Sequence, residues 1–164
     1  MGVLDDWQFC PRCGGELAPA ADHLACSACG GQYWANAIPA VQGILERDGR
    51  VLLARRGIEP RRGFWDLPGG FLHETESAVE GLRREFREET GLDVEPVQLL
   101  RIDIEPYDRR HVFSVTWLVV GDGEPVAADD VAELHWFGPD ELPELAFPGQ
   151  NLVLGEWVAR QLES

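Results

Sequence analysis

The stretch that decides the fold reads GFLHETE at residues 70–76 and REFREETGL at residues 84–92. Between and across these segments, residues 77–90 have a helical pattern. Ser77 and Glu80 stand at the spacing of a capping box, in which each end of the pair satisfies a free backbone amide of the other. Gly91 stands where a helix commonly ends in the left-handed conformation. The sequence therefore predicts a helix from Ser77 to Thr90.

One face of this predicted helix is acidic. Glu85, Glu88 and Glu89 lie at positions i, i+3 and i+4, so they share a face and repel one another. A neighbouring face is apolar and can pack on a sheet (Val79, Leu82 and Phe86). A hard divalent cation with oxygen ligands would relieve the repulsion. The alternative interpretation is a solvated acidic face.

The complete spacing favours the metal site. The fixed positions are Gly70, Glu76, Arg84, Glu85, Glu88, Glu89 and Gly91, with apolar residues at 86 and 92. This is the spacing of the Nudix box, and the chain resembles the Nudix hydrolases at every fixed position. The resemblance implies an α/β fold in which an α/β/α sandwich surrounds a mixed β-sheet. It also implies a pyrophosphohydrolase that cleaves a nucleoside diphosphate linked to another moiety, using Mg²⁺ or Mn²⁺.

The resemblance also implies the roles of the box residues. The three glutamates would hold the catalytic metal, and the carbonyl of Gly70 could add a ligand. Glu76 and Arg84 would form a supporting ion pair that fixes the glycine loop. For the general base we rank Glu133 and Asp130 first and keep Asp129 as a further candidate. The alternative for these three is a solvated acidic loop.

The segments around the box predict a mixed sheet covered by helices. Residues 38–46 and 50–55 flank Asp48-Gly49, a strong hairpin signal. Further strands are expected at residues 94–104, 111–120 and 134–137, and a closing helix at 148–162. Strands and helices mix without strict alternation, which favours this architecture.

A cluster of arginines precedes the glycine turn. Arg55, Arg56, Arg61 and Arg62 can grip phosphate oxygens, because each guanidinium presents a planar fork of donors. They could instead be solvated or pair with neighbouring acids. The aromatic candidates for stacking on a base are Trp65, Phe71, Tyr107 and Phe113, and we assign Trp65 to the substrate-binding set.

Two cysteine pairs mark the first segment. Cys10 and Cys13 form one C-x-x-C unit, and Cys26 and Cys29 form another after twelve intervening residues. Each unit can present two sulfurs to one tetrahedral ion. We predict a structural Zn²⁺ in a zinc ribbon at residues 1–36, followed by a Nudix domain at 37–164. A redox dithiol and a pair of disulfides are the alternatives.

The residues after the box narrow the choice of substrate. A ribbon before a Nudix domain resembles the NADH pyrophosphatases, but their Ser-Gln-Pro-Trp-Pro-Phe-Pro-like array is absent from residues 101–110. Pro106 stands near a proline of the ADP-ribose hydrolases. We expect an ADP-ribose, FAD or NADH-like substrate, giving a nucleoside monophosphate and a phosphorylated product. The alternatives are a housecleaning hydrolase of (deoxy)nucleoside triphosphates and a non-catalytic module that senses nucleotides or binds nucleic acid.

Composition limits the partners. The chain has 164 residues and a formal net charge of −15, and its basic residues are all arginine. Such a surface repels nucleic acid and anionic membranes. No apolar run is long enough to span a bilayer, and no signal-peptide pattern opens the chain. We expect a cytoplasmic protein with a small-molecule nucleotide substrate, and the family resemblance allows a homodimer.

Overall fold

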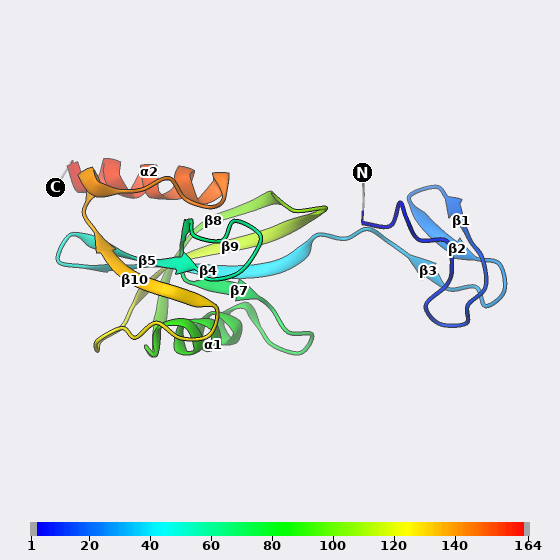
Figure 1. Cartoon of the computed structure of the whole chain (residues 1–164), viewed down its shortest axis with the longest axis horizontal. Helices are drawn as coiled ribbons and strands as arrows, with labels where there is room; N and C mark the ends of the chain where they lie inside the picture. The colour runs from blue at the N-terminus through cyan, green and yellow to red at the C-terminus, as the bar shows by residue number, and fades with distance from the viewer. Residues whose placement is uncertain (1–2, 163–164) are drawn as a thin grey trace.

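The computed structural model describes residues 3–162, and within them the strands form two sheets (Figure 1). The small sheet joins β1 (Leu17–Ala20), β2 (His23–Cys26) and β3 (Gln32–Tyr33), all antiparallel. The large sheet begins with β4 (Ile38–Arg47). The domain boundary placed after residue 36 remains a prediction, and it falls in the connection between the two sheets.

The large sheet is mixed, as the sequence predicts. Its main order is β10-β5-β4-β9-β8, with β6 (Trp65–Asp66) paired to β5 and β7 (Gly69–Phe71) paired to β4. Strands β4 and β9 run parallel, whereas the other neighbours are antiparallel. The remaining strands are β5 (Arg50–Arg56), β8 (Glu95–Tyr107), β9 (Arg110–Val120) and β10 (Val131–Phe137).

Strands β4 and β5 separate soon after the hairpin that joins them. Asp48 and Gly49 both have positive φ, 52° and 71°, as the short turn requires. The two strands pair only at Glu46 with Val51 and at Arg47 with Arg50. Beyond that point β4 pairs with β7, and β5 pairs with β6. The sheet is therefore split, and the candidate site lies at the split.

Helix α1 (Ala78–Thr90) forms as its end signals predict. Ser77 and Glu80 make both hydrogen bonds of the capping box, and Gly91 adopts the left-handed conformation with φ 71°. Leu82 and Phe86 are fully buried against the sheet. Gly43 of β4 allows this packing, because a Cβ there would lie 2.7 Å from the Phe86 ring.

The opposite face of the sheet is covered by α2 (Pro148–Leu162). Val153, Leu154 and Trp157 pack there on Ile44 and Leu53 in a second core. With α1 on the first face, these layers make the predicted α/β/α sandwich (Figure 1). A short 3₁₀ helix, η1 (Pro139–Glu141), precedes α2. Within residues 3–162, no helix combines the length and apolar character needed to cross a membrane.

Two strands are longer than the sequence predicts. Strand β8 reaches Tyr107 although it contains Pro96 and Pro106, and β10 starts at Val131. Prolines argue against a central strand because they cannot donate to the ladder. Strand β8 tolerates them because it is an edge strand, paired only with β9. This extension carries Glu105 and Tyr107 to the site.

Candidate active site

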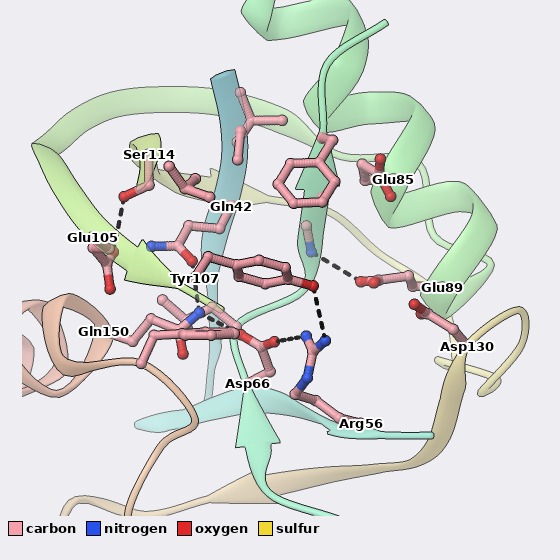
Figure 2. A pocket seen from close by; sticks show the side chains of 18 of the residues that line it. Gln42, Arg56, Asp66, Glu85, Glu89, Glu105, Tyr107, Ser114, Asp130 and Gln150 are labelled. Carbon is pink, nitrogen blue, oxygen red and sulfur yellow. Dashed lines mark hydrogen bonds and ion pairs between the residues drawn. The ribbon is translucent and has the colours of Figure 1, made fainter. Parts of the chain in front are cut away.

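Helix α1 places two of its glutamates against the glycine turn, as Figure 2 shows. The backbone N–H of Gly69 donates a 2.9 Å hydrogen bond to Glu89. Gly70 leaves the space that the Glu85 carboxylate occupies, because a Cβ on Gly70 would lie 2.6 Å from that carboxylate. The box therefore brings the helix and the turn into direct contact.

Arg84 joins the acidic residues of the box. Its guanidinium donates to Glu76 at 3.0 and 2.5 Å, to Glu85 at 2.7 Å and to Glu88 at 2.9 Å. It also donates to the carbonyl of Phe71 at 2.9 Å. The bonds from Arg84 lower the pKa of Glu76 to about 2. The contact expected between Glu76 and Arg84 is thus present, and it ties the helix to the loop before it.

The charge of Glu89 is poorly compensated, and that of Glu85 is compensated only in part by Arg84. Burial raises the pKa of Glu89 well above its ordinary value, and the nearby Asp66 and Asp130 raise it further. Burial also raises the pKa of Glu85, against the effect of Arg84. These carboxylates are oxygen donors confined with like charges, so the donor set fits a hard dication such as Mg²⁺ or Mn²⁺.

The glutamates form one side of a cavity of about 400 Å³. Its other side is a polar wall made by residues of β4, β8, β9 and α2, seen opposite α1 in Figure 2 (Gln42, Glu105, Ser114 and Gln150). Tyr107 lies between the two sides. The volume is in the range of small-molecule sites.

Arg56 is the one predicted phosphate-binding arginine that lines this cavity. Its guanidinium donates to Asp66 at 2.6 Å and to the Tyr107 hydroxyl at 3.5 Å, and it lies 5.3 Å from the centre of the Phe147 ring. Burial disfavours its charge, but the Asp66 carboxylate raises the pKa of Arg56 above its ordinary value. Arg56 is therefore a fixed cation that faces the glutamates.

The polar wall is held by a chain of buried hydrogen bonds. Glu105 accepts from Ser114 at 2.9 Å and from the N–H of Gly149, near the start of α2, at 3.1 Å. Gln150 donates to Gln42 at 2.7 Å and also to Asp66. None of these residues is predicted from the sequence, although polar residues within otherwise apolar strands are a signal that could have found them.

The remaining residues of the predicted substrate-binding set lie outside the cavity lining. Arg55 donates to the carbonyl of Gly63 at 3.1 Å and to Glu133 at 3.4 Å. Arg61 lies over the Phe64 ring, and Arg62 is exposed. Trp65 packs edge to face on Phe137 with the ring centroids 4.8 Å apart. Arg61 and Arg62 lie in the loop between β5 and β6, whereas Arg55 lies on β5 and Trp65 on β6.

The two leading candidates for the general base are separated by the structure. Asp130 lines the cavity close to Glu89, together with Asp129 (Figure 2). Its carbonyl accepts a 2.7 Å hydrogen bond from Gly57, which fixes the loop against the end of β5. Glu133 lies on β10 beside Arg55 and does not line the cavity. The geometry favours Asp130.

The four cysteines of the small sheet converge. Their Sγ atoms all lie within 4.8 Å of one another, with Cys10 3.7 Å from Cys29 and Cys13 3.6 Å from Cys26. Both C-x-x-C turns have the same backbone pattern, in which a glycine four residues on donates to the first cysteine's carbonyl. Four thiol ligands in this arrangement fit a structural Zn²⁺.

The four thiols influence one another's ionisation. The Tyr33 hydroxyl, 3.0 Å from Cys10, lowers the pKa of Cys10 to about 6. The amide of Gly15 favours the Cys13 thiolate, but the other thiols outweigh it and raise the pKa of Cys13 to about 12. Four neighbouring thiolates repel one another, and a bound dication removes that penalty.

Comparison with known proteins places this geometry in a family. The model of the NUDIX domain matches residues 37–158. An ADP-ribose pyrophosphatase from Methanocaldococcus jannaschii is 39% identical over 118 residues, which cover 70% of this chain and 69% of that protein. The NAD-capped RNA hydrolase NudC of Escherichia coli O1:K1 is 27% identical over 146 residues, which cover 87% of this chain and 56% of NudC. This chain therefore spans about half the length of NudC.

Solved structures agree with the sequence comparisons. A NUDIX hydrolase from Nitrosomonas europaea superposes with a TM-score of 0.83 and 27% identity, covering 96% of this chain and 93% of that one. Because nearly the whole chain is covered, the likeness includes residues on both sides of the connection between the two sheets.

Proposed function

Because this chain belongs to the Nudix family and is a pyrophosphohydrolase of that family, we propose that its substrate is ADP-ribose or a closely related nucleoside diphosphate sugar. The reaction adds water across the diphosphate bond and releases a nucleoside monophosphate and a sugar phosphate. One observation carries the proposal: the three box glutamates and Arg56 line the same cavity.

The chain's own residues supply charge and orientation. Arg56 has guanidinium donors beyond those used by Asp66, Tyr107 and Pro60, and these would bind a phosphate oxygen. Asp130 would accept the proton of the attacking water. Arg84 would keep Glu85 and Glu88 in place through its bonds to both. Glu133 stays a weaker candidate for the base, because Arg55 holds it beside β5.

A divalent cation completes the proposed site. Glu85, Glu88 and Glu89, with the carbonyl of Gly70, would hold Mg²⁺ or Mn²⁺, which neutralises the diphosphate and activates water when bound. The fit rests on the buried, mutually repelling carboxylates of Glu85 and Glu89. The four cysteines would hold Zn²⁺ in a structural role.

The relatives guide the choice of substrate. The archaeal relative is named for ADP-ribose and is more similar in sequence than NudC, which is named for NAD-capped RNA. Pro106, which the ADP-ribose resemblance implied, lines the cavity. FAD and NADH remain the second choice. The strongly acidic composition argues against nucleic acid as a substrate.

A substrate panel tests the proposal. Purified protein is incubated with ADP-ribose, FAD, NADH and nucleoside triphosphates, each with Mg²⁺ and with Mn²⁺, and the products are separated by chromatography. We expect AMP and ribose 5-phosphate from ADP-ribose, at the highest kcat/KM of the panel. Preferential release of pyrophosphate from a nucleoside triphosphate would instead assign the housecleaning activity. No turnover by folded protein would support a binding module.

A further inference from the structure

A second cavity, of about 530 Å³, adjoins the first. Phe71 and Tyr107 line both cavities, and their rings meet edge to face with centroids 5.3 Å apart. These two rings therefore separate the cavity that holds the glutamates from the second one. A substrate that extends past the rings would leave one cavity and enter the other.

The polar groups of the second cavity are available to a ligand. Glu59, Asp108 and Arg110 line it, and all three residues are exposed. Within residues 3–162, none of these three side chains takes part in a hydrogen bond or ion pair. Arg84 and Arg56, by contrast, already donate hydrogen bonds to neighbouring residues.

The walls of the second cavity are fixed by the same residues that build the first. Arg56 donates a 2.8 Å hydrogen bond from Nε to the carbonyl of Pro60, beside Glu59. Tyr107 and Arg110 form the last pair of the β8–β9 ladder, so the turn that carries Asp108 closes directly on Tyr107. The two cavities therefore share wall residues. A ligand bound in one cavity lies next to the other cavity.

The chemistry of this lining fits a sugar. Two carboxylates would repel a phosphate, but they accept hydrogen bonds from hydroxyl groups. Arg110 can donate to hydroxyl or ring oxygens, and the half-exposed Phe71 ring offers an apolar surface to the C–H groups of a sugar. We infer that this cavity binds the sugar of the leaving half, a ribose-type polyol carried on the distal phosphate. This inference rests on the proposed function.

The test compares two substrates that differ only in the second moiety. ADP-ribose carries the sugar, whereas the β-methyl ester of ADP has a methyl group in its place. We expect the double variant Glu59→Gln/Asp108→Asn to lower the ratio of kcat/KM for ADP-ribose to that for the methyl ester about tenfold, because a neutral amide oxygen accepts a weaker hydrogen bond than a charged carboxylate does. The decrease in kcat/KM for ADP-ribose should come from a higher KM. Arg110→Ala should lower the same ratio.

Controls separate the possible failures. Glu144→Gln removes a charge from an exposed residue outside both cavities and should leave the ratio unchanged. Thermal unfolding of each variant checks that the fold is kept. An unchanged ratio in the Glu59/Asp108 and Arg110 variants would overturn the sugar site and leave the hydrolase proposal standing. Failure of the unmodified protein to cleave either compound would overturn the proposed function itself.

Discussion

Arg84 shows how one residue organises the box. Its guanidinium contacts Glu76, Glu85 and Glu88 together with a carbonyl of the preceding loop. The carboxylates in turn raise the pKa of Arg84 above its ordinary value. The guanidinium therefore stays charged and compensates part of the acidic face, which explains how three glutamates share one side of a helix in the absence of substrate.

Glu76→Gln tests this network through its pH dependence. The pKa of Glu76 is lowered from 4.5 to about 2, so its stabilising effect is present above about pH 4.5 and is lost as pH falls towards 2. We expect the variant to be less stable than the unmodified protein by about 1–3 kcal/mol at neutral pH. Urea unfolding at several pH values should show this difference shrinking below pH 4.5.

The neighbouring Glu74 provides the control. It is exposed, and Glu74→Gln should have little effect on stability at any pH. A stability difference for Glu76→Gln that persists unchanged to pH 2 would show that the Glu76–Arg84 pair is not the source.

The positions of site residues could be predicted from sequence only where a motif fixes them. The box places Glu85, Glu88 and Glu89 together because their spacing on a helix is rigid, and all three line the cavity, while their role as metal ligands stays a proposal. By contrast, Arg61 and Arg62 lie in the loop between β5 and β6, and no spacing rule fixes the conformation of such a loop. Arg56 lies in the cavity, whereas Arg61 and Arg62 do not.

At the scale of elements, α1 was the most predictable. Its capping box and terminal glycine are local signals, and the structure forms both. Strand β8 was the least predictable, because its prolines suit only an edge strand and edge position depends on the whole sheet. Glu105 of the polar wall was missed for this reason, since it lies on the unpredicted end of β8.

Gly70→Ala tests the contact between α1 and the glycine turn. The φ of Gly70 is not in the left-handed region, so alanine fits the backbone, but its Cβ would lie 2.6 Å from the Glu85 carboxylate. We expect kcat/KM for ADP-ribose to fall at least about tenfold, because the Cβ would displace Glu85, a proposed metal ligand, and disturbing the groups that orient a ligand costs activity on the order of 10–100-fold. The melting temperature should change little.

Gly155→Ala is the matched control in α2. A Cβ there meets no atom within 4 Å, so this variant should keep its activity and gain about 0.5–1 kcal/mol of stability. Full activity of Gly70→Ala would contradict the placement of Glu85 against the turn.

At the scale of the whole molecule, the cavity depends on the separation of β4 and β5, which no local sequence pattern encodes. The hairpin at Asp48-Gly49 is predictable, but the divergence of β4 and β5 arises because β6 and β7 pair with them from a later part of the chain. This long-range pairing creates the cavity. Gln42 of β4, Arg56 of β5 and Gln150 of α2 meet there although they are far apart in sequence.

The N-terminal segment that carries the cysteines contacts the β8–β9 hairpin. Asp6 pairs with Arg109 at the tip of the β8–β9 hairpin, next to Asp108. Both groups are largely exposed, so the pair alone contributes little to stability. Its position nevertheless places the proposed zinc ribbon beside the hairpin that lines the second cavity.

The most direct test of the proposed metal-dependent hydrolysis is the magnesium dependence of AMP release from ADP-ribose, measured for the unmodified protein and for Glu89→Gln. Glutamine keeps the size of the buried side chain, so the variant should fold normally. We predict that AMP release by the unmodified protein requires the metal, and that Glu89→Gln lowers turnover by orders of magnitude. Equal turnover by the two proteins, or full turnover with the metal chelated, would contradict the assignment of the box glutamates as metal ligands.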